Sequence, residues 1–547
     1  MARLSEYVIM RLRGLVTVAL VMIASGLPAT AVPHHAAAAP AAPPARPATA
    51  PARPATAPAR PATAQGRIDI NGDGYPDLVI NQDRAARILY GSPTGLSASR
   101  SAFFPDDVLT QPLPEDFESS GSTTAAADFD GDGYTDLAVG VPEAQVGRKS
   151  SAGAVYVLYG SATGLDPTRR QTWSQDSSGV AGTAEPGDWF GGALAAGDFD
   201  GSGDADLAIG VPGEQLRGHR SWPGAVHVLY GSARGLTANR SRWLTSGSPG
   251  VPGTLRDKAF GAALAAGDLT ASGYDDVVVG VPGARANGRQ AAGAVVVLRG
   301  GPTGITSKRA QRWTQATKGV HGRAEAGDEF GGGPLVVGHF AGRRYADVAV
   351  GVRLERVRGQ IQAGAVNVLY GTARGLTSKG NQIWTKASAG ISGKPGEYEE
   401  FGISLASADL GRNGGTTTYD DLAVGAIWGN GGAVFVLHGS ATGLTARGSQ
   451  RWTLASPGVP EDPDDLDSFG ASVAAADFGR GPYADLVIGI PDLIVDGDGS
   501  EPERGGGVLL LRSTRDGLTG AGSTIWTNSS FGPDAGAPQL GYGLLAR

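Results

Sequence analysis

The stretch that decides the fold is Asp128-Phe129-Asp130-Gly131-Asp132-Gly133-Tyr134-Thr135-Asp136, which places acidic residues at positions 1, 3, 5 and 9 of a nine-residue loop. A hard cation such as Ca²⁺ takes about six to eight oxygen ligands. Alternate loop positions direct side-chain oxygens inward, and the glycine at position 6 permits a sharp turn. The apolar segment 137–140 follows at once and predicts a buried strand, not the exit helix of an EF-hand. The stretch therefore predicts a calcium loop within a β-hairpin.

The acidic loop recurs along the chain. A second copy spans Asp69–Asp77 and a third spans Asp198–Asp206, while weaker copies start at Asp268, His339, Asp409 and Asp477. The seven starts are separated by 59, 70, 70, 71, 70 and 68 residues. A nearly fixed period of this length indicates a protein built from repeated supersecondary units.

Each copy lies within a common pattern of four short strands. In the third copy, Phe190-Gly191 opens a strand that runs to the acidic loop, and Leu207–Gly210 forms the next strand. The segment Gly224–Gly231 alternates with period two, and a short fourth strand carries Trp243. Four antiparallel strands in each repeat predict one propeller blade. The seven loops therefore predict an all-β, seven-bladed β-propeller.

The two ends of the chain predict how the propeller closes. Leu540-Gly541 takes the place of Phe-Gly, and the chain stops where another acidic loop would begin. At the other end, the loop at Asp69 has no full strand before it. We therefore expect the last strand, about Leu540 to Ala546, to complete the first blade from its inner side, which removes open sheet edges.

A large aromatic residue recurs in the fourth strand of every repeat. Its size and regular recurrence predict packing between blades, not a ligand platform. These residues are Phe103, Trp173, Trp243, Trp313, Trp384, Trp452 and Trp526.

The N-terminus predicts export from the cell. Arg11 and Arg13 precede an apolar run, and small residues follow it, which is the order of a secretory signal. An uncleaved membrane anchor is the alternative, although the run is short for a bilayer span. Residues 32–65 contain three copies of Pro-Ala-Arg-Pro-Ala-Thr-Ala and predict an extended stalk or a disposable leader. We thus expect a signal peptide at 1–31, a stalk at 32–65 and a propeller at 66–547, in a secreted or cell-surface protein.

Composition narrows the possible functions. The net charge is −7, and residues 1–65 hold six Arg and one Glu, so they carry +5 and the remainder carries −12. An acidic globular part argues against nucleic acid as a partner. The absence of cysteine excludes disulfides and thiol chemistry.

The repeated combination of Phe190-Gly191, an Asp-rich loop, Gly210-Val211-Pro212 and Gly224-Ala225-Val226 resembles FG-GAP repeats. Such repeats form the seven-bladed propeller of integrin α subunits and occur in many secreted bacterial proteins. The resemblance implies that the loops at 69 and 128 bind Ca²⁺ on a lower face and that ligands engage the opposite, upper face. It does not imply integrin signalling, because the later integrin domains have no counterpart in this sequence.

Ligand counting ranks the loops as calcium sites. The loop at 128 offers four carboxylates, the loops at 69 and 198 offer three ligand carboxylates each, and the loop at 268 offers two. Position 7 is included because its backbone carbonyl can supply a further ligand. The predicted metal residues are Asp69, Asn71, Asp73, Tyr75, Asp77, Asp128, Asp130, Asp132, Tyr134, Asp136, Asp198, Asp200, Ser202, Asp204, Asp206, Asp268, Thr270, Ser272 and Asp276.

The last three loops lack most of these ligands. His339, Ala341 and Arg343 stand in the fifth loop, and Gly479 and Gly481 stand in the seventh. An acid nevertheless persists at the last position of each loop, after an insertion at 414–418 in the sixth, which predicts that it accepts hydrogen bonds from turn amides without a metal. These acids are Asp347, Asp421 and Asp485.

No catalytic constellation emerges, because the histidines are scattered and no Gly-x-Ser-x-Gly motif exists. We therefore expect no enzyme, but a monomeric, calcium-binding propeller that acts as an extracellular binding or adhesion module for protein or carbohydrate. The alternative is a secreted polysaccharide lyase or hydrolase with a site on the upper face. Divergent charged loops suit recognition, and a solvated rim is the other interpretation. The charged loops are basic at 217–222 and 353–358 and acidic at 461–467 and 496–503.

Overall fold

The computed structural model divides the chain into two units, Met1–Gly66 and Arg67–Arg547. It describes residues 67–82, 85–105, 123–216, 221–342, 344–412, 419–428, 431–460, 468–479, 481–495, 503–532 and 540–546. The predicted signal peptide and stalk lie outside these ranges and remain predictions. In the described part of the chain, none of the helices has the length and apolar character needed to span a bilayer.

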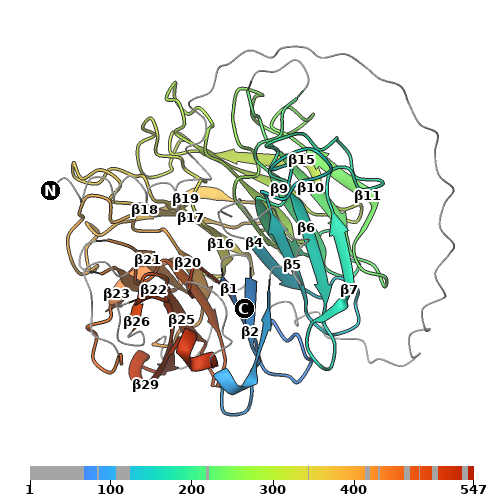
Figure 1. Cartoon of the computed structure of the whole chain (residues 1–547). Coiled ribbons are helices and arrows are strands. Elements are labelled where there is room, and N and C mark those ends of the chain that lie inside the picture. The colour runs from blue at the N-terminus through green and yellow to red at the C-terminus, as the bar shows by residue number, and fades with distance from the viewer. Residues whose placement is uncertain are drawn as a thin grey trace. The chain divides into compact units, whose positions relative to one another are not determined.

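The second unit is all-β and forms a seven-bladed propeller of four-stranded antiparallel sheets (Figure 1). The first blade contains β30 (Gly543–Leu545), β1 (Leu78–Gln82), β2 (Ala85–Leu89) and β3 (Ser101–Phe104), from the inside outward. The second, third and fourth blades follow as β4 (Thr123–Ala127), β5 (Asp136–Val141), β6 (Ala154–Tyr159), β7 (Asp166–Trp173); β8 (Ala193–Gly197), β9 (Asp206–Val211), β10 (Ala225–Tyr230), β11 (Thr237–Leu244); and β12 (Leu264–Gly267), β13 (Asp276–Val281), β14 (Ala294–Arg299), β15 (Thr306–Trp313).

The remaining blades keep the same order. They contain β16 (Leu335–Gly338), β17 (Asp347–Val352), β18 (Ala365–Tyr370), β19 (Thr377–Trp384); β20 (Leu405–Ala408), β21 (Asp421–Ala426), β22 (Ala433–His438), β23 (Thr445–Trp452); and β24 (Ser472–Ala476), β25 (Asp485–Ile490), β28 (Gly507–Thr514), β29 (Gly517–Thr527). A small ribbon of β26 (Ile494–Val495) and β27 (Glu503–Arg504) extends the seventh blade, and η1 (Ala98–Arg100) and η2 (Asn528–Phe531) are single 3₁₀ turns.

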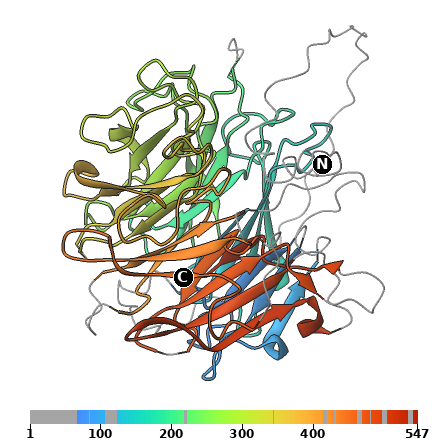
Figure 2. The ribbon, with the colours of Figure 1, turned by 90° about the vertical axis from the view of Figure 1, so that its left-hand side faces the viewer.

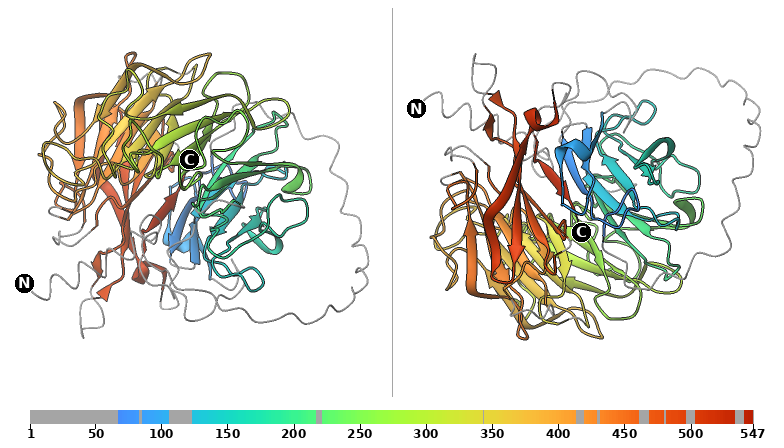
Figure 3. Two further views of the ribbon diagram at one scale, coloured as in Figure 1. Left: turned by 90° about the horizontal axis from the view of Figure 1, so that it is seen from above. Right: turned by 90° about the horizontal axis from the view of Figure 1, so that it is seen from below.

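The C-terminal strand closes the ring from the inside, as predicted. Strand β30 pairs antiparallel with β1, with Leu544 opposite Ile80. Each innermost strand contacts the innermost strand of the next blade, and β30 contacts both β24 and β4. Figure 2 shows the strands of the first blade beside those of the seventh, and Figure 3 shows the sheets following one another in chain order around the propeller. The inner edge of β1 is therefore paired and not left open.

Burial follows the position of each strand in its blade. From the second blade to the sixth, the second and third strands are buried along their whole length, because both of their faces pack against neighbouring blades. Their Val, Ile, Leu and Ala content suits strands that are covered on both sides. One such core joins Val226 of the third blade to Val277 and Val296 of the fourth. The outer strands, such as β11, are mostly half-buried or exposed.

The Phe-Gly and Gly-Ala-Val segments meet at the joint between consecutive blades. Phe260 is fully buried and forms an isolated parallel bridge with Gly224 of the preceding blade. Gly224 has φ +76°, and a Cβ atom there would overlap the backbone nitrogen and oxygen of Phe260. Only glycine fits both conditions. The same bridge joins Gly293 to Phe330, Gly432 to Phe469 and Gly506 to Leu540.

The recurrent aromatic residue keeps its structural place in five blades, where a tryptophan stands opposite the second residue of the third strand. Phe103 and Trp243 do not hold this position in the first and third blades, although Trp243 packs against the core between the second and third blades as predicted. Phe104 takes the place in the first blade, opposite Ala86, and Leu244 takes it in the third, opposite Val226. Trp243 is one position out, and a shift of one residue turns a strand side chain to the other face.

Candidate metal centres and the opposite face

The acidic loops connect the first and second strands of each blade. In the second and third blades, the aspartate at position 1 holds the loop in its folded conformation. Asp128 accepts hydrogen bonds from the amides of Asp132 (3.1 Å) and Gly133 (2.9 Å). Asp198 accepts the equivalent bonds from Ser202 and Gly203, both at 3.0 Å. Such bonds direct the side chains of the loop toward a common centre.

The aspartate at position 9 fastens the loop to the blade. Asp136 accepts one hydrogen bond from the amide of Phe129 and one from the amide of Gly160, both at 2.8 Å. Phe129 is fully buried and anchors the loop in the core. The prediction for the three poor loops is confirmed, because the acids at their last position accept hydrogen bonds from backbone amides. The donors are Ala341 and Gly371 to Asp347, Leu410 and Gly439 to Asp421, and Ser513 to Asp485.

Two loops gather three carboxylates around one point. Asp128, Asp130 and Asp136 each offer an oxygen, and these oxygens lie within 4.8 Å of one another. Asp198, Asp200 and Asp206 do the same in the third blade. Burial, followed by the charge of neighbouring carboxylates, raises the pKa of Asp136 to about 9. Burial likewise raises the pKa of Asp206 to about 8. A divalent cation would relieve this concentration of negative charge, so the residues fit Ca²⁺.

The loop at 69 is less complete. Asp69 accepts hydrogen bonds from the amides of Asp73 (3.0 Å) and Gly74 (2.9 Å), and burial raises the pKa of Asp77 to about 7. Asp73 forms an ion pair with Arg100 at 2.9 Å, and Asn71 donates a hydrogen bond to Asp73 at 3.2 Å. The carboxylates of this loop do not converge as closely as those of the next two loops.

The residues at positions 5 and 7 share local turn contacts. The amides of Tyr75 and Tyr134 donate to the carboxylates of Asp73 and Asp132, each at 3.0 Å. In the third loop, the Ser202 hydroxyl donates to the carbonyl of Asp204 at 3.3 Å. These contacts tighten the loops and leave the metal role of the carbonyls a prediction.

The loop at 268 already contains its own cation. The guanidinium of Arg299, at the end of the third strand, pairs with Asp276 at 2.7 Å, and both side chains are buried. Thr270 and Ser272 direct their hydroxyls to Asp268, each at 3.4 Å. The geometry therefore favours this loop less than its neighbours as a calcium site.

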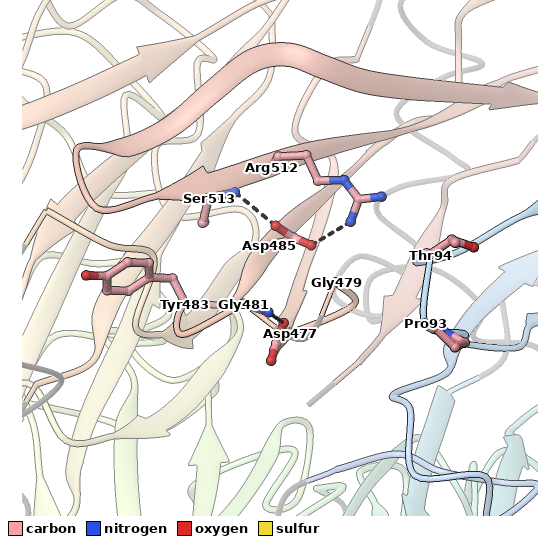
Figure 4. A pocket seen from close by; sticks show the side chains of 9 residues that line it. All are labelled: Pro93, Thr94, Asp477, Gly479, Gly481, Tyr483, Asp485, Arg512 and Ser513. Atoms are coloured by element: carbon pink, nitrogen blue, oxygen red, sulfur yellow. Dashed lines mark hydrogen bonds and ion pairs between the residues drawn. The ribbon is translucent and has the colours of Figure 1, made fainter. Parts of the chain in front are cut away.

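The seventh loop lines a hollow of about 300 Å³ (Figure 4). Arg512 pairs with Asp485 at 2.8 Å, and the amide of Gly481 donates to Asp477 at 2.7 Å. Gly479 and Gly481 contribute no ligand atoms, as the sequence predicts. In the fifth loop, the Nδ1 atom of His339 lies 3.2 Å from the carbonyl oxygens of Gly342 and Tyr345. Arg343 lies outside the described residues.

The upper face carries one unusual tyrosine in the connection between β19 and β20. Tyr398 has φ +62° and is 47% exposed. Gly187 and Gly327 hold the equivalent position in two other repeats, with φ +83° and +87°. The equivalence is shown by a shared hydrogen bond, in which the amide of this residue donates to the hairpin between the second and third strands. The bonds run from Gly187 to Ser150, from Gly327 to Gln290 and from Tyr398 to Ile361.

A tyrosine in this backbone region is strained, because its Cβ crowds the backbone where glycine has none. The hairpin that receives its hydrogen bond also carries Arg356 and Arg358, and both are exposed. Arg353 pairs with Glu400 at 3.4 Å beside them. The predicted basic loop therefore lies in the hairpin that accepts the hydrogen bond from the backbone of Tyr398. Residues 217–220, 461–467 and 496–502 of the other predicted loops lie outside the described residues.

Comparison with known proteins identifies the repeats. The family model described as FG-GAP repeat matches residues 120–158, 190–229 and 260–298. This chain contains FG-GAP repeats. The matched segments begin before the inner strand of the second, third and fourth blades and end within their third strands, so each contains an acidic loop.

The chain is also similar to parts of two other kinds of protein. The chain is 34% identical over 172 residues to phosphatidylinositol-glycan-specific phospholipase D of Rattus norvegicus, covering 31% of this chain and 19% of that protein. It is 30% identical over 273 residues to integrin alpha-PS2 of Drosophila melanogaster, covering 49% of this chain and 17% of that protein. The chain therefore matches only about a fifth of the length of these relatives. One of them is named as an enzyme, which leaves catalytic activity open for this chain.

A solved structure of Bacillus licheniformis rhamnogalacturonan lyase aligns with a TM-score of 0.35 and 11% identity, over 78% of this chain and 69% of that chain. A likeness at this level supports no conclusion about activity.

Sequence reasoning missed two features of the FG-GAP repeats. The first is Tyr398, which a comparison of the connections between blades could have found as a tyrosine where other repeats have glycine. The second is a set of arginines that reach the acidic loops from the fourth strand. Arg100, Arg169 and Arg240 belong to this set. Alignment on the tryptophans hides them, because Trp243 is one position out of register.

Proposed function

We propose that this protein is a secreted, calcium-stabilised propeller that binds an extracellular protein or carbohydrate through its upper face. The observation that carries the binding half is Tyr398, a strained and exposed aromatic residue where two other repeats have glycine. Strain of this kind persists where function retains it, since a glycine would remove it at no steric cost. Secretion rests on the N-terminal sequence alone.

Calcium is the cation that the acidic loops suit best, because all their ligands are oxygens. The residues that would hold it in the second blade are Asp128, Asp130, Asp132 and Asp136. In the third blade they are Asp198, Asp200 and Asp206, with Ser202. The ion would balance the buried carboxylates and so stabilise the loops, and it would perform no chemistry on a ligand.

Tyrosine and arginine together suit a polar ligand with apolar faces. The aromatic ring offers a flat surface for a sugar or an apolar side chain, and its hydroxyl can form a hydrogen bond. Exposed guanidinium groups on the hairpin that its backbone contacts supply charged donors. Rigid aromatic and arginine residues also dominate the binding energy of protein interfaces.

The calcium half is tested by calorimetric titration and by melting curves with and without a chelator. Asp130→Ala combined with Asp132→Ala should remove one binding event and lower the melting temperature in Ca²⁺. One occupied site contributes about 2.7 kcal/mol of stability at a hundredfold excess over Kd. An unchanged calcium stoichiometry, or an equal melting temperature in saturating Ca²⁺, would contradict the proposal.

The binding half is tested on glycan and extracellular-protein arrays, with Tyr398→Gly as the matched variant. Glycine is the residue of two other repeats at this position, so the variant should fold and melt at the same temperature or slightly higher. We expect it to lose the signals that the wild type gives. Signals that survive in Tyr398→Gly would exclude this tyrosine from the binding surface.

A second candidate is an enzyme, and one observation favours it. Asp188 and Glu214 are buried on the upper face, and burial raises the pKa of each to about 7. Perturbed carboxylates are typical of acid–base catalysts. Both side chains are almost fully covered, however, which disfavours direct contact with a large substrate. Turnover of a polysaccharide or an ester that is lost in Asp188→Asn would establish the enzyme and displace a purely binding role.

A further inference from the structure

The fourth strands carry a further pattern, which their pairing register reveals. The blades can be compared at one common position, the residue of the outermost strand that pairs with the fourth residue of the third strand. In the second blade this is Gln171, which pairs with Val157. The residue two positions before this common position is an arginine in the first four blades and a glycine in the last three. These residues are Arg100, Arg169, Arg240, Arg309, Gly380, Gly448 and Gly522.

In the first three blades this arginine reaches the acidic loop of its own blade. Arg240 pairs with Asp200 at 2.7 Å, and Arg100 pairs with Asp73 at 2.9 Å. Arg169 pairs with Asp130 and, at 3.4 Å, with Asp132. The carboxylates at position 3 are buried, with 1% of the Asp130 side chain and 6% of the Asp200 side chain exposed. The arginine is therefore the main charge that faces these acids from solvent.

A tyrosine at the end of the third strand lies beneath the guanidinium. The Arg169 guanidinium carbon lies 4.6 Å from the ring centre of Tyr159, and that of Arg240 lies 5.1 Å from the ring centre of Tyr230. A cation over an aromatic face is attracted to it. The ring thus favours the conformation in which the arginine meets the loop.

The fourth blade has the arginine but lacks its acidic partner. Arg309 has φ +63°, nearly the value of +62° at Arg240. Its loop has Thr270 and Ser272 where the third loop has Asp200 and Ser202. No ion pair joins Arg309 to any residue of 268–276, all of which the structure describes. The last three blades lack acids at positions 3 and 5 and have glycine instead of arginine. The fourth-strand arginine and an acid at position 3 or 5 of its own loop thus meet only in the first three blades.

We propose that Arg100, Arg169 and Arg240 are built-in counter-ions that balance the acidic loops without a metal and oppose a divalent cation there. The inference rests on the proposed calcium function. A fixed positive charge beside a ligand carboxylate repels a cation that approaches the same carboxylate, and it lowers the electrostatic energy of the loop when the cation is absent. Calcium affinity would then be set by the arginine as well as by the ligand count.

The test compares Arg240→Gln with Arg309→Gln in the whole chain. Both changes remove one charge from the same backbone conformation, but only Arg240 faces an acid at position 3. We expect Arg240→Gln to bind Ca²⁺ at the third-blade loop roughly tenfold more tightly by calorimetry, because the opposing charge is gone. In chelator, the same variant should melt about 1–3 °C lower, since Asp200 loses its partner. Arg309→Gln should change neither value.

Each result decides a separate point. Calcium affinity that is equal or weaker in Arg240→Gln, with a wild type that binds Ca²⁺, would overturn the inference and leave the calcium function standing. An equal gain in Arg309→Gln would overturn it as well, because the effect would then be one of net charge. A wild type that binds no Ca²⁺ would overturn the calcium function and the opposing role together. A lower chelator melting temperature of Arg240→Gln would still identify the counter-ion.

Discussion

Asp188 and Glu214 are two buried carboxyl groups that make the stability of the protein depend on pH. Asp188 accepts a hydrogen bond from the amide of Glu185 at 2.6 Å, and its other carboxylate oxygen is buried without a hydrogen-bond partner in the described part of the chain. Gln175 donates to Glu214 at 2.5 Å. Burial is the main cause of both raised pKa values, and the Asp188 charge raises that of Glu214 further.

The sign of the pH effect follows from the direction of these shifts. A carboxyl whose pKa is higher in the folded than in the unfolded protein contributes stability below about pH 4, and this stability is lost as the pH rises through about 7. Asp188→Asn should therefore match the wild type in free energy of unfolding at pH 4 and exceed it at pH 8, by a few kcal/mol at most. Melting curves in chelator at both values measure this. A variant that is less stable at pH 8 would show that the charged form is favoured in the fold.

The joint between blades acts at the scale of the element. A glycine immediately precedes the third strand of one blade and lies against the first residue of the Phe-Gly pair of the next blade. Gly224 and Phe260 form one such joint. A Cβ atom at Gly224 would overlap backbone atoms of Phe260. It could be accommodated only if a strand of one of the two blades moved.

Gly224→Ala should therefore cost more than its backbone strain alone. Gly288 supplies the control, since it has φ +77° and a Cβ there would meet nothing within 4 Å. We expect Gly288→Ala to lower the free energy of unfolding by about 1 kcal/mol. Gly224→Ala should lower it by at least about 2 kcal/mol more, because the backbone overlap adds to the strain. Denaturant unfolding of both variants gives the comparison, and equal losses would refute the role of the joint.

Closure of the ring belongs to the whole molecule. Strand β30 supplies the inner edge of the first blade, and the core between the seventh and first blades includes Leu540 with Leu78 and Ile80. Without β30, the buried strand β1 would present an unpaired edge to solvent.

A chain that ends at residue 539 should therefore melt at a lower temperature and associate through the exposed edge of β1. Size-exclusion chromatography and thermal unfolding measure both effects. A peptide of residues 540–547, added in excess, should restore the monomer by pairing with β1. A truncated chain that stays monomeric with an unchanged melting temperature would show that the propeller closes without this strand.

The sequence by itself determined the seven blades, their closure and the ranking of the acidic loops. These features depend on local patterns, because the loop ligands lie within nine residues and the strands alternate or are apolar throughout. Counting ligands ranked the loops at 128 and 198 among the richest, and these are the loops whose carboxylates converge.

Only the tertiary structure decided which charges meet and which residues are strained. Arg240 and Asp200 are 40 residues apart and come together because the fourth strand pairs in one particular register. In the third blade, Leu244 takes the paired position that tryptophan holds elsewhere, so the recurrence of tryptophan misplaces the register by one residue. The pairing of Arg299 with Asp276 and the positive φ of Tyr398 likewise depend on the folded backbone. The repeat therefore fixes the scaffold, while contacts between strands distant in sequence decide what each blade can bind.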